Sequence, residues 1–435
     1  MRSWKSFSTN FATLAARLSV TGATLIVTFV ACRRMTGEEF GLWSILMWLN
    51  QLTNGFDLGF QLTLGNRLAA LGSRGVDGET ERRETFISIL LLQVFLVAVY
   101  GCIILVAVPL VPWARLFKIA DPLLIRQVVP LLPIIFFIMV GTLPVGLIWT
   151  VFFAYGEIKL ASVLAGIFNI IQTLVFVVSA YTCNFTQVIL IYFSCNIVIG
   201  AILTAYVFIR RKWSFTLLPL ARITEIVRSM ARVSFHAFWH TITAIISTIL
   251  GPIVSGGIFG LVVAGEFNLF LKLFSFLVAA HMAIMAPVGP SVSLESHSGD
   301  WEAVRRRLRL WVYRVWPAYF LVLGAIIWCT HPFLIRLWAG HSLTRYPLAA
   351  VLLLWACLSG FVNTFSIFLN SLGLVKAQAA LSMVMLVPSL LLPVLLSRWL
   401  GLPGVALSMA LCLLPAAIIW PFYTRRALRL HIVRV

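Results

Sequence analysis

The chain has 435 residues, of which 61% are hydrophobic and only 11% are charged. Soluble domains carry about 25% charged residues, so this composition excludes an ordinary soluble enzyme and predicts an integral membrane protein. The formal net charge of +19 would also suit a nucleic-acid-binding protein, and only the positions of the basic residues can separate the two classes.

Long apolar segments follow one another along the chain. The hydrocarbon core of a bilayer is about 30 Å thick, and a helix needs roughly 20 apolar residues to cross it. We therefore predict an all-α protein with about twelve transmembrane helices, at residues 8–31, 41–65, 86–111, 124–154, 160–181, 186–209, 230–252, 258–286, 310–330, 347–370, 377–397 and 403–424. Little of the chain remains outside these spans, so no soluble catalytic domain and no enzyme is predicted.

The basic residues lie mainly on one side of the predicted membrane. With the N-terminus in the cytoplasm, about two thirds of the 33 lysines and arginines fall in cytoplasmic segments, as the positive-inside rule requires. Both termini are then cytoplasmic. Such loops are also attracted to anionic headgroups, so we expect membrane lipids as partners and no nucleic acid.

The first predicted span carries a polar stripe around a cation, Arg17. Its members are spaced by three or four residues and share one helical face, and they are Asn10, Thr13, Arg17, Thr21, Thr24 and Thr28. A charge at the bilayer centre costs roughly 2.5–3.5 kcal/mol on insertion scales, so Arg17, Thr21 and Thr24 are candidate cavity residues. Alternatively, Arg17 extends to the cytoplasmic surface and the hydroxyls serve helix packing.

The second predicted span contributes three further candidates, Gln51, Asn54 and Asp57, which lie on one helical face. Asp57 belongs to the segment Asn54–Gly59, whose two glycines allow neighbouring backbones to approach closely. Its carboxylate could bind a proton or an ion during transport, or it could form a structural pair with a cation.

Two histidines, His236 and His240, lie four residues apart in the seventh predicted span, a spacing that a metal ion accepts. No carboxylate or cysteine nearby completes a ligand set, so neither a metal nor another cofactor is predicted. The sequence also has no nucleophile elbow, Walker loop or zinc-protease motif. Covalent catalysis and ATP hydrolysis within the chain are therefore not expected.

The eighth predicted span contains a second lone cation, Lys272, on a face with Asn268 and Ser275. Asn363 in the tenth span is a further candidate, together with His240 in the seventh. The two cationic faces lie in spans that are far apart in sequence. Together they predict one buried basic cavity that holds an anionic molecule.

The chain is predicted to be a duplication. The motif at Glu38–Trp43 recurs at Gly265–Phe270, and the Gly-x-x-Lys motif at Gly156–Lys159 recurs at Gly373–Lys376. Six spans lie in each half, so the halves have one orientation and should be related by an axis along the membrane normal. The predicted domains are an N-terminal six-helix bundle at 1–209, a cytoplasmic basic linker at 210–229 and a C-terminal six-helix bundle at 230–435.

The run Met35-Thr-Gly-Glu-Glu-Phe-Gly-Leu-Trp43, followed by Asp57-Leu-Gly59, resembles the polysaccharide (O-antigen type) flippases. These belong to the multidrug/oligosaccharidyl-lipid/polysaccharide exporter superfamily, with the multidrug and toxin extrusion (MATE) antiporters and the lipid II flippases. The resemblance implies two bundles in a V around a central cavity lined by spans one, two, seven and eight. It further implies that Arg17 and Lys272 handle a polyprenyl-diphosphate-linked glycan. Twelve spans suit the polysaccharide branch better than the lipid II branch, which typically has fourteen.

The resulting hypothesis is a flippase of the bacterial inner membrane that moves a lipid-linked oligosaccharide outward for surface polysaccharide biosynthesis. A polysaccharide polymerase and its chain-length machinery are possible partners. One alternative is a cation-coupled drug or metabolite antiporter of the MATE type, which would need acidic cavity residues, and Asp57 is the clear candidate. A second is a membrane-embedded polymerase, although the longest predicted outer loop lacks the paired acidic residues that such an enzyme needs.

Overall fold

The computed structural model describes residues 22–72, 75–285, 288–343 and 345–432. Over these ranges all regular structure is helical and no strand occurs, so the all-α prediction is confirmed. The contacts divide the described chain into two compact units. The first comprises the residues up to Ile245 together with Phe259–Val262, and the second comprises Ile246–Ile258 and the residues from Val263 onward.

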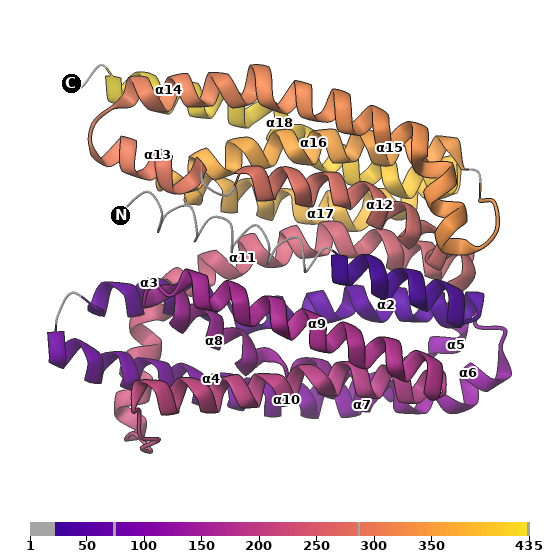
Figure 1. The fold of residues 1–435 in the computed structure, drawn as a ribbon, viewed down its shortest axis with the longest axis horizontal. Helices are drawn as coiled ribbons and strands as arrows, with labels where there is room; N and C mark the ends of the chain where they lie inside the picture. Colours follow the sequence, from indigo (N-terminus) through magenta and orange to yellow (C-terminus); the bar gives the residue numbers. More distant parts are fainter. Residues whose placement is uncertain (1–21, 73–74, 286–287, 344, 433–435) are drawn as a thin grey trace. The chain divides into compact units, whose positions relative to one another are not determined.

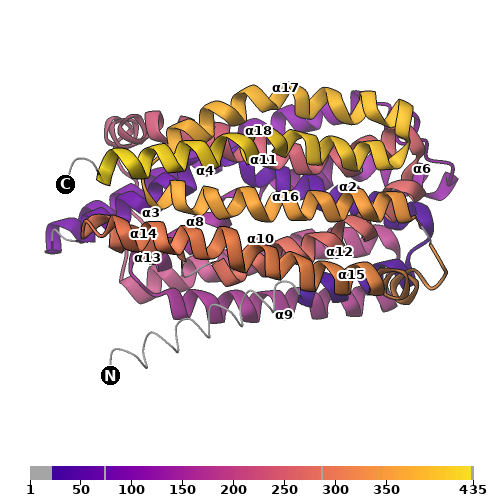
Figure 2. The same ribbon diagram turned by 90° about the horizontal axis from the view of Figure 1, so that it is seen from above.

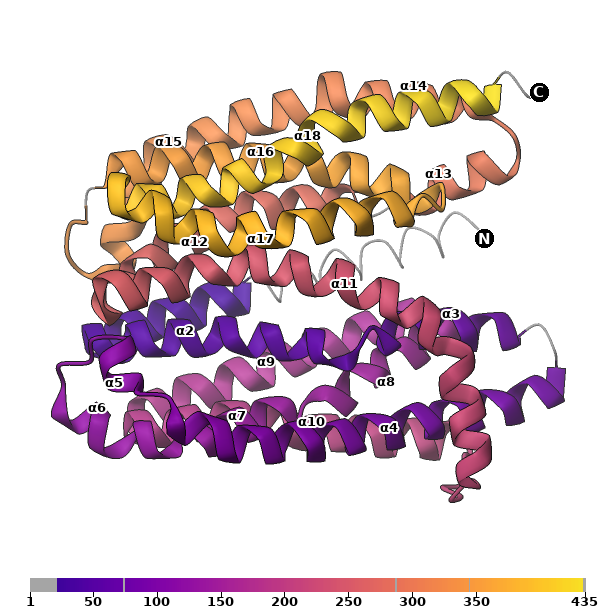
Figure 3. The same cartoon turned by 180° about the vertical axis from the view of Figure 1, so that it is seen from behind.

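The first unit begins with a helix over residues 22–34. Its further elements are α2 (Gly37–Thr53), η1 (Asn54–Asp57), α3 (Phe60–Leu71), α4 (Gly75–Leu110), α5 (Trp113–Leu116), α6 (Pro122–Gln127), η3 (Val129–Leu131), α7 (Leu132–Val140), α8 (Leu143–Ala154), α9 (Ile158–Thr182), α10 (Phe185–Arg211) and most of α11 (Leu220–Phe259). Helix α10 packs against α7, α8 and α9, while α4 packs against α3, α7 and α8 (Figures 1 and 3).

The second unit holds the rest of α11 and most of α12 (Leu261–Met285). Its further elements are α13 (Val288–His297), α14 (Trp301–Leu310), the π-helical turn η4 (Trp311–Val315), α15 (Trp316–Ala339), α16 (Tyr346–Ser371), α17 (Val375–Leu400) and α18 (Leu402–Ile432). Helix α18 packs along both α16 and α17 (Figure 2). Helices α14, η4 and α15 follow one another as one long rod, which the view in Figure 1 shows along its length.

The helices confirm a multi-pass membrane protein. Among the described residues, nine helical segments are long and apolar enough to cross a bilayer, and α11 adds a tenth if its two bent parts count as one span. All ten overlap predicted spans. Of the other two predictions, the first span begins outside the described residues. The second, at 41–65, was predicted as one helix, which is wrong, because it is broken into α2, η1 and α3.

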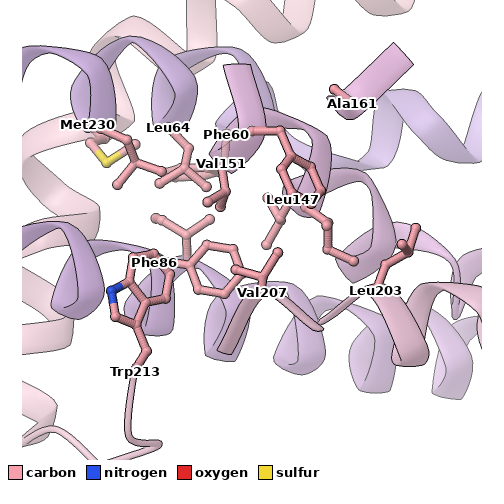
Figure 4. Close-up of a cluster of buried hydrophobic side chains, with 14 of the residues drawn as sticks. Phe60, Leu64, Phe86, Leu147, Val151, Ala161, Leu203, Val207, Trp213 and Met230 are labelled. Carbon is pink, nitrogen blue, oxygen red and sulfur yellow. The ribbon is translucent and has the colours of Figure 1, made fainter. Parts of the chain in front are cut away.

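An apolar core lies between α3, α4, α8 and α10 of the first unit (Figure 4). Phe86 and Phe152 are fully buried there, and Trp213 closes one end with its ring centroid 5.4 Å from that of Phe86. Trp213 belongs to the segment 210–229, which the sequence analysis assigned to a cytoplasmic linker. This segment packs onto the first unit, and from Leu220 it is part of α11. The boundary between two six-helix bundles stays a prediction.

The two predicted copies share one turn, with the same geometry. Gly156 and Gly373 both adopt left-handed backbone, with φ of +69° and +72°, and each lies two residues before the start of the next helix, at Ile158 or Val375. In each turn the residue after the glycine donates its N–H five residues back, from Glu157 to Phe152 and from Leu374 to Leu369. This is the Schellman arrangement that ends many helices, and the duplication itself stays a prediction.

Candidate functional site

The predicted site residues fall into three groups. Arg17 and Thr21 lie outside the described residues, as do the side chains of Asn54 and His240. In the first unit, Thr24 and Gln51 are exposed and Asp57 is buried. In the second unit, Asn268 is buried, while Lys272, Ser275 and Asn363 are half-buried.

The second membrane helix of the first unit is interrupted at Asp57. Leu58 and Gly59 adopt left-handed backbone, with φ of 54° and 77°, which a continuous helix cannot contain. The Asp57 carboxylate bridges the interruption, since Oδ1 accepts the Gly59 N–H at 2.9 Å and Oδ2 accepts the Gln61 N–H at 2.8 Å. Both oxygens therefore bind the amide groups that the start of α3 leaves without helical partners. Asp57 has a structural role at this break.

Two side chains of α4 bind backbone carbonyls at the same break. Gln93 is fully buried, and its Nε2 donates to the Asp57 carbonyl at 3.3 Å. The Tyr100 hydroxyl donates to the Phe56 carbonyl at 3.2 Å. Within a bilayer, such freed backbone groups must find partners in the protein. Neither residue was predicted as part of a site, because the third span is otherwise apolar.

Helix α11 passes very close to this break. A Cβ added at Gly59 would lie 2.2 Å from the Ser234 carbonyl oxygen, and one at Gly55 would lie 2.8 Å from a methyl carbon of Ile242. The hydroxyls of Thr63 and Ser234 are 2.6 Å apart in a buried hydrogen bond. The glycines of Asn54–Gly59 therefore serve close helix packing, as their residue type predicted.

The end of the first unit that carries Arg210 and Arg211, its basic end, holds a half-buried cluster around Glu79. Its Oε1 accepts hydrogen bonds from the Tyr155 hydroxyl at 2.5 Å and from the Trp213 indole at 2.9 Å. The guanidinium of Arg211 lies over the Tyr155 ring, 3.7 Å from its centroid. Burial, and next the hydrogen bond to Glu79, raise the pKa of Tyr155 above its ordinary value. The hydroxyl therefore stays protonated and keeps donating.

In the second unit, one face of α12 packs into the core of that unit. Phe270 and Phe274 contact the His331 ring, and the Leu277 carbonyl accepts a hydrogen bond from Tyr319 at 2.8 Å. His281 is fully buried, and its Nε2 lies 3.1 Å from the Thr364 hydroxyl. That hydroxyl gives its own proton to the Gly360 carbonyl. The histidine must therefore donate from Nε2, which makes it a bonded core histidine.

Lys272 lies on the opposite face of α12. A helix turns about 100° per residue, so Lys272 is about 200° away from Phe274 and from the packed face. Asn268, Ser275 and Ala279 share the face of Lys272, and exposure along this face rises from fully buried at Asn268, through half-buried at Ser275, to exposed at Ala279. The Lys272 side chain therefore leaves α12 on the side away from the aromatic core of the second unit. Helix α12 is a candidate membrane span, and a charge within such a helix is costly.

The described candidate residues differ in the chemical groups that they carry. Asp57, the acidic candidate, already uses both carboxylate oxygens for backbone amides. Lys272 and Ser275 offer donors, and Asn363 offers both a donor and an acceptor, as phosphate and sugar hydroxyls require. A grouping of histidine, cysteine and acidic side chains that would suit a metal ion does not occur among the described residues.

The fold resembles those of known membrane transporters. The inward-facing conformation of a multidrug resistance MATE family transporter of the MOP superfamily aligns with a TM-score of 0.71 and 15% identity, over 96% of this chain and 98% of the other. The outward-facing conformation of such a transporter aligns with a TM-score of 0.67 and 14% identity, over 99% and 96%. A MOP superfamily transporter from Pyrococcus furiosus aligns with 0.64 and 13%, over 98% and 95%.

Neither the family models nor the curated proteins gave a match. The alignments cover nearly the full length of each chain at identities near 15%, which is evidence for a shared fold and does not extend to a shared substrate. The chain is thus an integral membrane protein with the all-helical fold of the MATE transporters of the MOP superfamily.

Proposed function

We propose that this protein is a flippase that moves a polyprenyl-diphosphate-linked oligosaccharide across the bacterial inner membrane by alternating access. The cytoplasmic leaflet supplies the substrate and the periplasmic leaflet receives it, for surface polysaccharide biosynthesis. Both termini lie in the cytoplasm in this proposal. A polysaccharide polymerase and its chain-length machinery would take over the delivered units.

The observation that carries the proposal is the position of Lys272. Its ammonium group is on a polar face of α12, opposite the face that packs onto His331 and Tyr319. A cation kept inside a membrane helix is by default a functional group. We assign it to the diphosphate of the substrate. In this proposal Ser275 and Asn363 form hydrogen bonds with the sugar hydroxyls, and Arg17 is a second cation that binds the diphosphate.

The membrane potential could supply the direction of transport. An inside-negative potential favours outward movement of negative charge by about 2.3 kcal/mol per charge per 100 mV. For a diphosphate with two charges this amounts to about 4.6 kcal/mol per 100 mV. Such a bias would need no ATP, in agreement with the absence of a nucleotide motif from the sequence.

The test is complementation of a bacterial strain that lacks its own lipid-linked oligosaccharide flippase. Lys272→Met keeps the length of the side chain and removes the charge, so it should abolish surface polysaccharide. Lys272→Arg keeps the charge and should retain part of the activity. Ser275→Ala is the matched control on the same face, where one weak sugar contact is lost. Normal polysaccharide with Lys272→Met, at equal protein in the membrane, would contradict the proposal.

The alternative is a cation-coupled antiporter of the MATE type, and the similarity to multidrug resistance transporters favours it. The same fold serves more than one function, since the Pyrococcus furiosus transporter is described as having a binding pocket of reverse polarity that suggests a different function. Dye efflux separates the two readings. An antiporter would restore dye resistance to an efflux-deficient strain, and Asp57→Asn would remove it.

A further inference from the structure

A cavity of about 240 Å³ opens on the second unit between α14, η4 and α18. Four arginines line it, Arg305 and Arg309 from α14 and Arg425 and Arg429 from α18. All four are exposed, whereas Phe365 and Leu308 at the cavity are buried. Arg425 donates to the hydroxyl of Tyr313, which also lines the cavity. The cavity therefore combines an apolar base with a ring of guanidinium groups.

The π-helical turn η4 helps to form this cavity. A π-helix inserts an extra residue into a turn and is frequently found at functional sites. Here it spans Trp311–Val315 and contributes Val312 and Tyr313 to the wall. A regular α-helix would turn these two side chains to a different direction. The irregular turn is consistent with selection for a binding surface at this place.

Acidic residues balance the charges at this cavity only in part, since Arg305 lies 3.9 Å from the exposed Glu302 carboxylate on its own helix. Arg305 and Arg309 are four residues apart, as are Arg425 and Arg429, and like charges at this spacing destabilise a helix. In the part of the chain that the structure describes, the cavity is lined by no acidic residue. The neighbouring Arg307 points elsewhere and forms an ion pair with Glu295. An anion in the cavity would relieve the repulsion between the four guanidinium groups.

The cavity lies next to exposed apolar side chains of the second unit, at the border between apolar and basic surface. Phe422 and Ile418 on α18 are 68% and 60% exposed, and Leu310 on α14 is 47% exposed, as expected of side chains that face lipid. The arginines follow within a turn or two of these residues. Tyr313, 60% exposed, is of the type enriched at the membrane–water interface. The anion should thus belong to a lipid.

We propose that this cavity binds the phosphate headgroup of an anionic membrane phospholipid such as phosphatidylglycerol. Arginine binds phosphate through two parallel N–H donors, and the apolar base accommodates the glycerol part. The volume of about 240 Å³ is below the roughly 300–1,000 Å³ of typical pockets for larger ligands, which suits a headgroup better than an oligosaccharide. The site is separate from the Lys272 face and does not depend on the proposed transport substrate.

The test is binding of fluorescently labelled phosphatidylglycerol to the purified full-length protein in detergent, followed by fluorescence anisotropy. The double variant Arg309→Ala/Arg429→Ala should weaken binding at least tenfold. The matched control is Arg306→Ala/Arg426→Ala, which removes the same charge from exposed positions of the same two helices that do not line the cavity. The control should stay within twofold of the wild type.

Unlabelled phosphatidylglycerol should compete with the label, while phosphatidylcholine, which has no net charge, should compete at least tenfold less. Equal loss of binding in the two double variants would overturn the proposal, because it would reduce the effect to general surface charge. Equal competition by inorganic phosphate would overturn the lipid assignment and leave a free-anion site. Thermal unfolding of both double variants near the wild-type midpoint would exclude misfolding as the cause.

Discussion

Substitution of Asp57 tests whether its carboxylate has a structural role or a role in transport. The carboxylate is 5% exposed and accepts two backbone N–H groups. A hydrogen bond to a charged group contributes about 1.5–3 kcal/mol, and water cannot easily replace it at a buried site. Asp57→Ala removes both bonds and should lower the free energy of unfolding by about 3–6 kcal/mol. Asp57→Asn keeps one acceptor oxygen and should lose roughly half of that.

The assay is thermal unfolding of the purified protein in detergent, read by the loss of monodisperse protein on size-exclusion chromatography. Asp57→Ala should have the lowest midpoint and Asp57→Asn an intermediate one. Gln51→Ala is the control, because Gln51 is exposed and lies in the same membrane segment before the break. Its midpoint should equal that of the wild type.

A coupling role for Asp57 predicts the opposite pattern. A carboxylate that exchanges a proton or ion during transport can be neutralised with little loss of stability and with complete loss of transport. If Asp57→Asn unfolds at the wild-type midpoint but fails in complementation, the structural role derived from its two backbone partners is refuted. That outcome would also strengthen the antiporter alternative.

Four further substitutions test other contacts. Gly59→Ala should prevent folding, because the added Cβ would lie 2.2 Å from a carbonyl oxygen. Gly156→Ala, whose Cβ would have nothing within 4 Å, should lower the free energy of unfolding only by the roughly 1–2 kcal/mol that left-handed backbone costs. Equal expression of the two variants would contradict this difference. The pKa of Tyr155 is raised above 10 in the folded state, so its hydrogen bond to Glu79 stabilises below pH 10 and is lost as the pH rises further. Tyr155→Phe should therefore lower the unfolding midpoint at pH 8 and flatten its fall above pH 10, and an unchanged pH profile would argue against the bond. Thr364→Val leaves the Nε2–H of His281 without its acceptor and should lower the free energy of unfolding by about 1–3 kcal/mol. The same unfolding assay measures this, and a wild-type midpoint would contradict the inferred tautomer.

Much of the fold could be predicted because membrane helices are specified by composition. A segment of roughly 20 apolar residues has few alternatives in a bilayer, and the predicted spans were confirmed where the structure describes them, apart from the second. The order of burial was also partly predictable. Polar faces on the eighth and tenth spans indicated inner helices, and α12 and α16 are the most buried spans, at 61% and 56% of their central windows.

The break at Asp57 could not be read from periodicity, because the apolar pattern of 41–65 continues through it. It depends on left-handed backbone at Leu58, a residue that seldom adopts it, and on partners 36 and 44 residues away in sequence. Helix α18 has a uniformly apolar sequence that would suit a lipid-facing helix, yet 44% of its most apolar window is buried, because α16 and α17 both pack on it. Hydropathy cannot separate a lipid neighbour from an apolar helix neighbour, since both are equally apolar.

The two predicted copies agree in the turns described above and differ in how they balance charge. The turn at Gly156 recurs at Gly373, and in each unit the second helix is followed by a shorter one, α3 after α2 and α13 after α12. At the basic end of the first unit, glutamates match the arginines, as in the pairs of Glu84 with Arg222 and Glu157 with Arg211.

In the second unit the corresponding end keeps the arginines of α14 and α18 around a cavity that is lined by no acid among the described residues. If the two halves are copies, both charges of each pair should recur, and Glu295 and Glu302 do pair with Arg307 and Arg305. The guanidinium groups that face a cavity with no acidic lining residue among the described residues still call for a separate explanation. A phosphate supplied by the membrane gives one, because it provides the second copy with the negative charge that glutamate provides in the first. On this reasoning, introducing a glutamate by Leu308→Glu should weaken phosphatidylglycerol binding, whereas Leu308→Gln, equally polar and uncharged, should weaken it less.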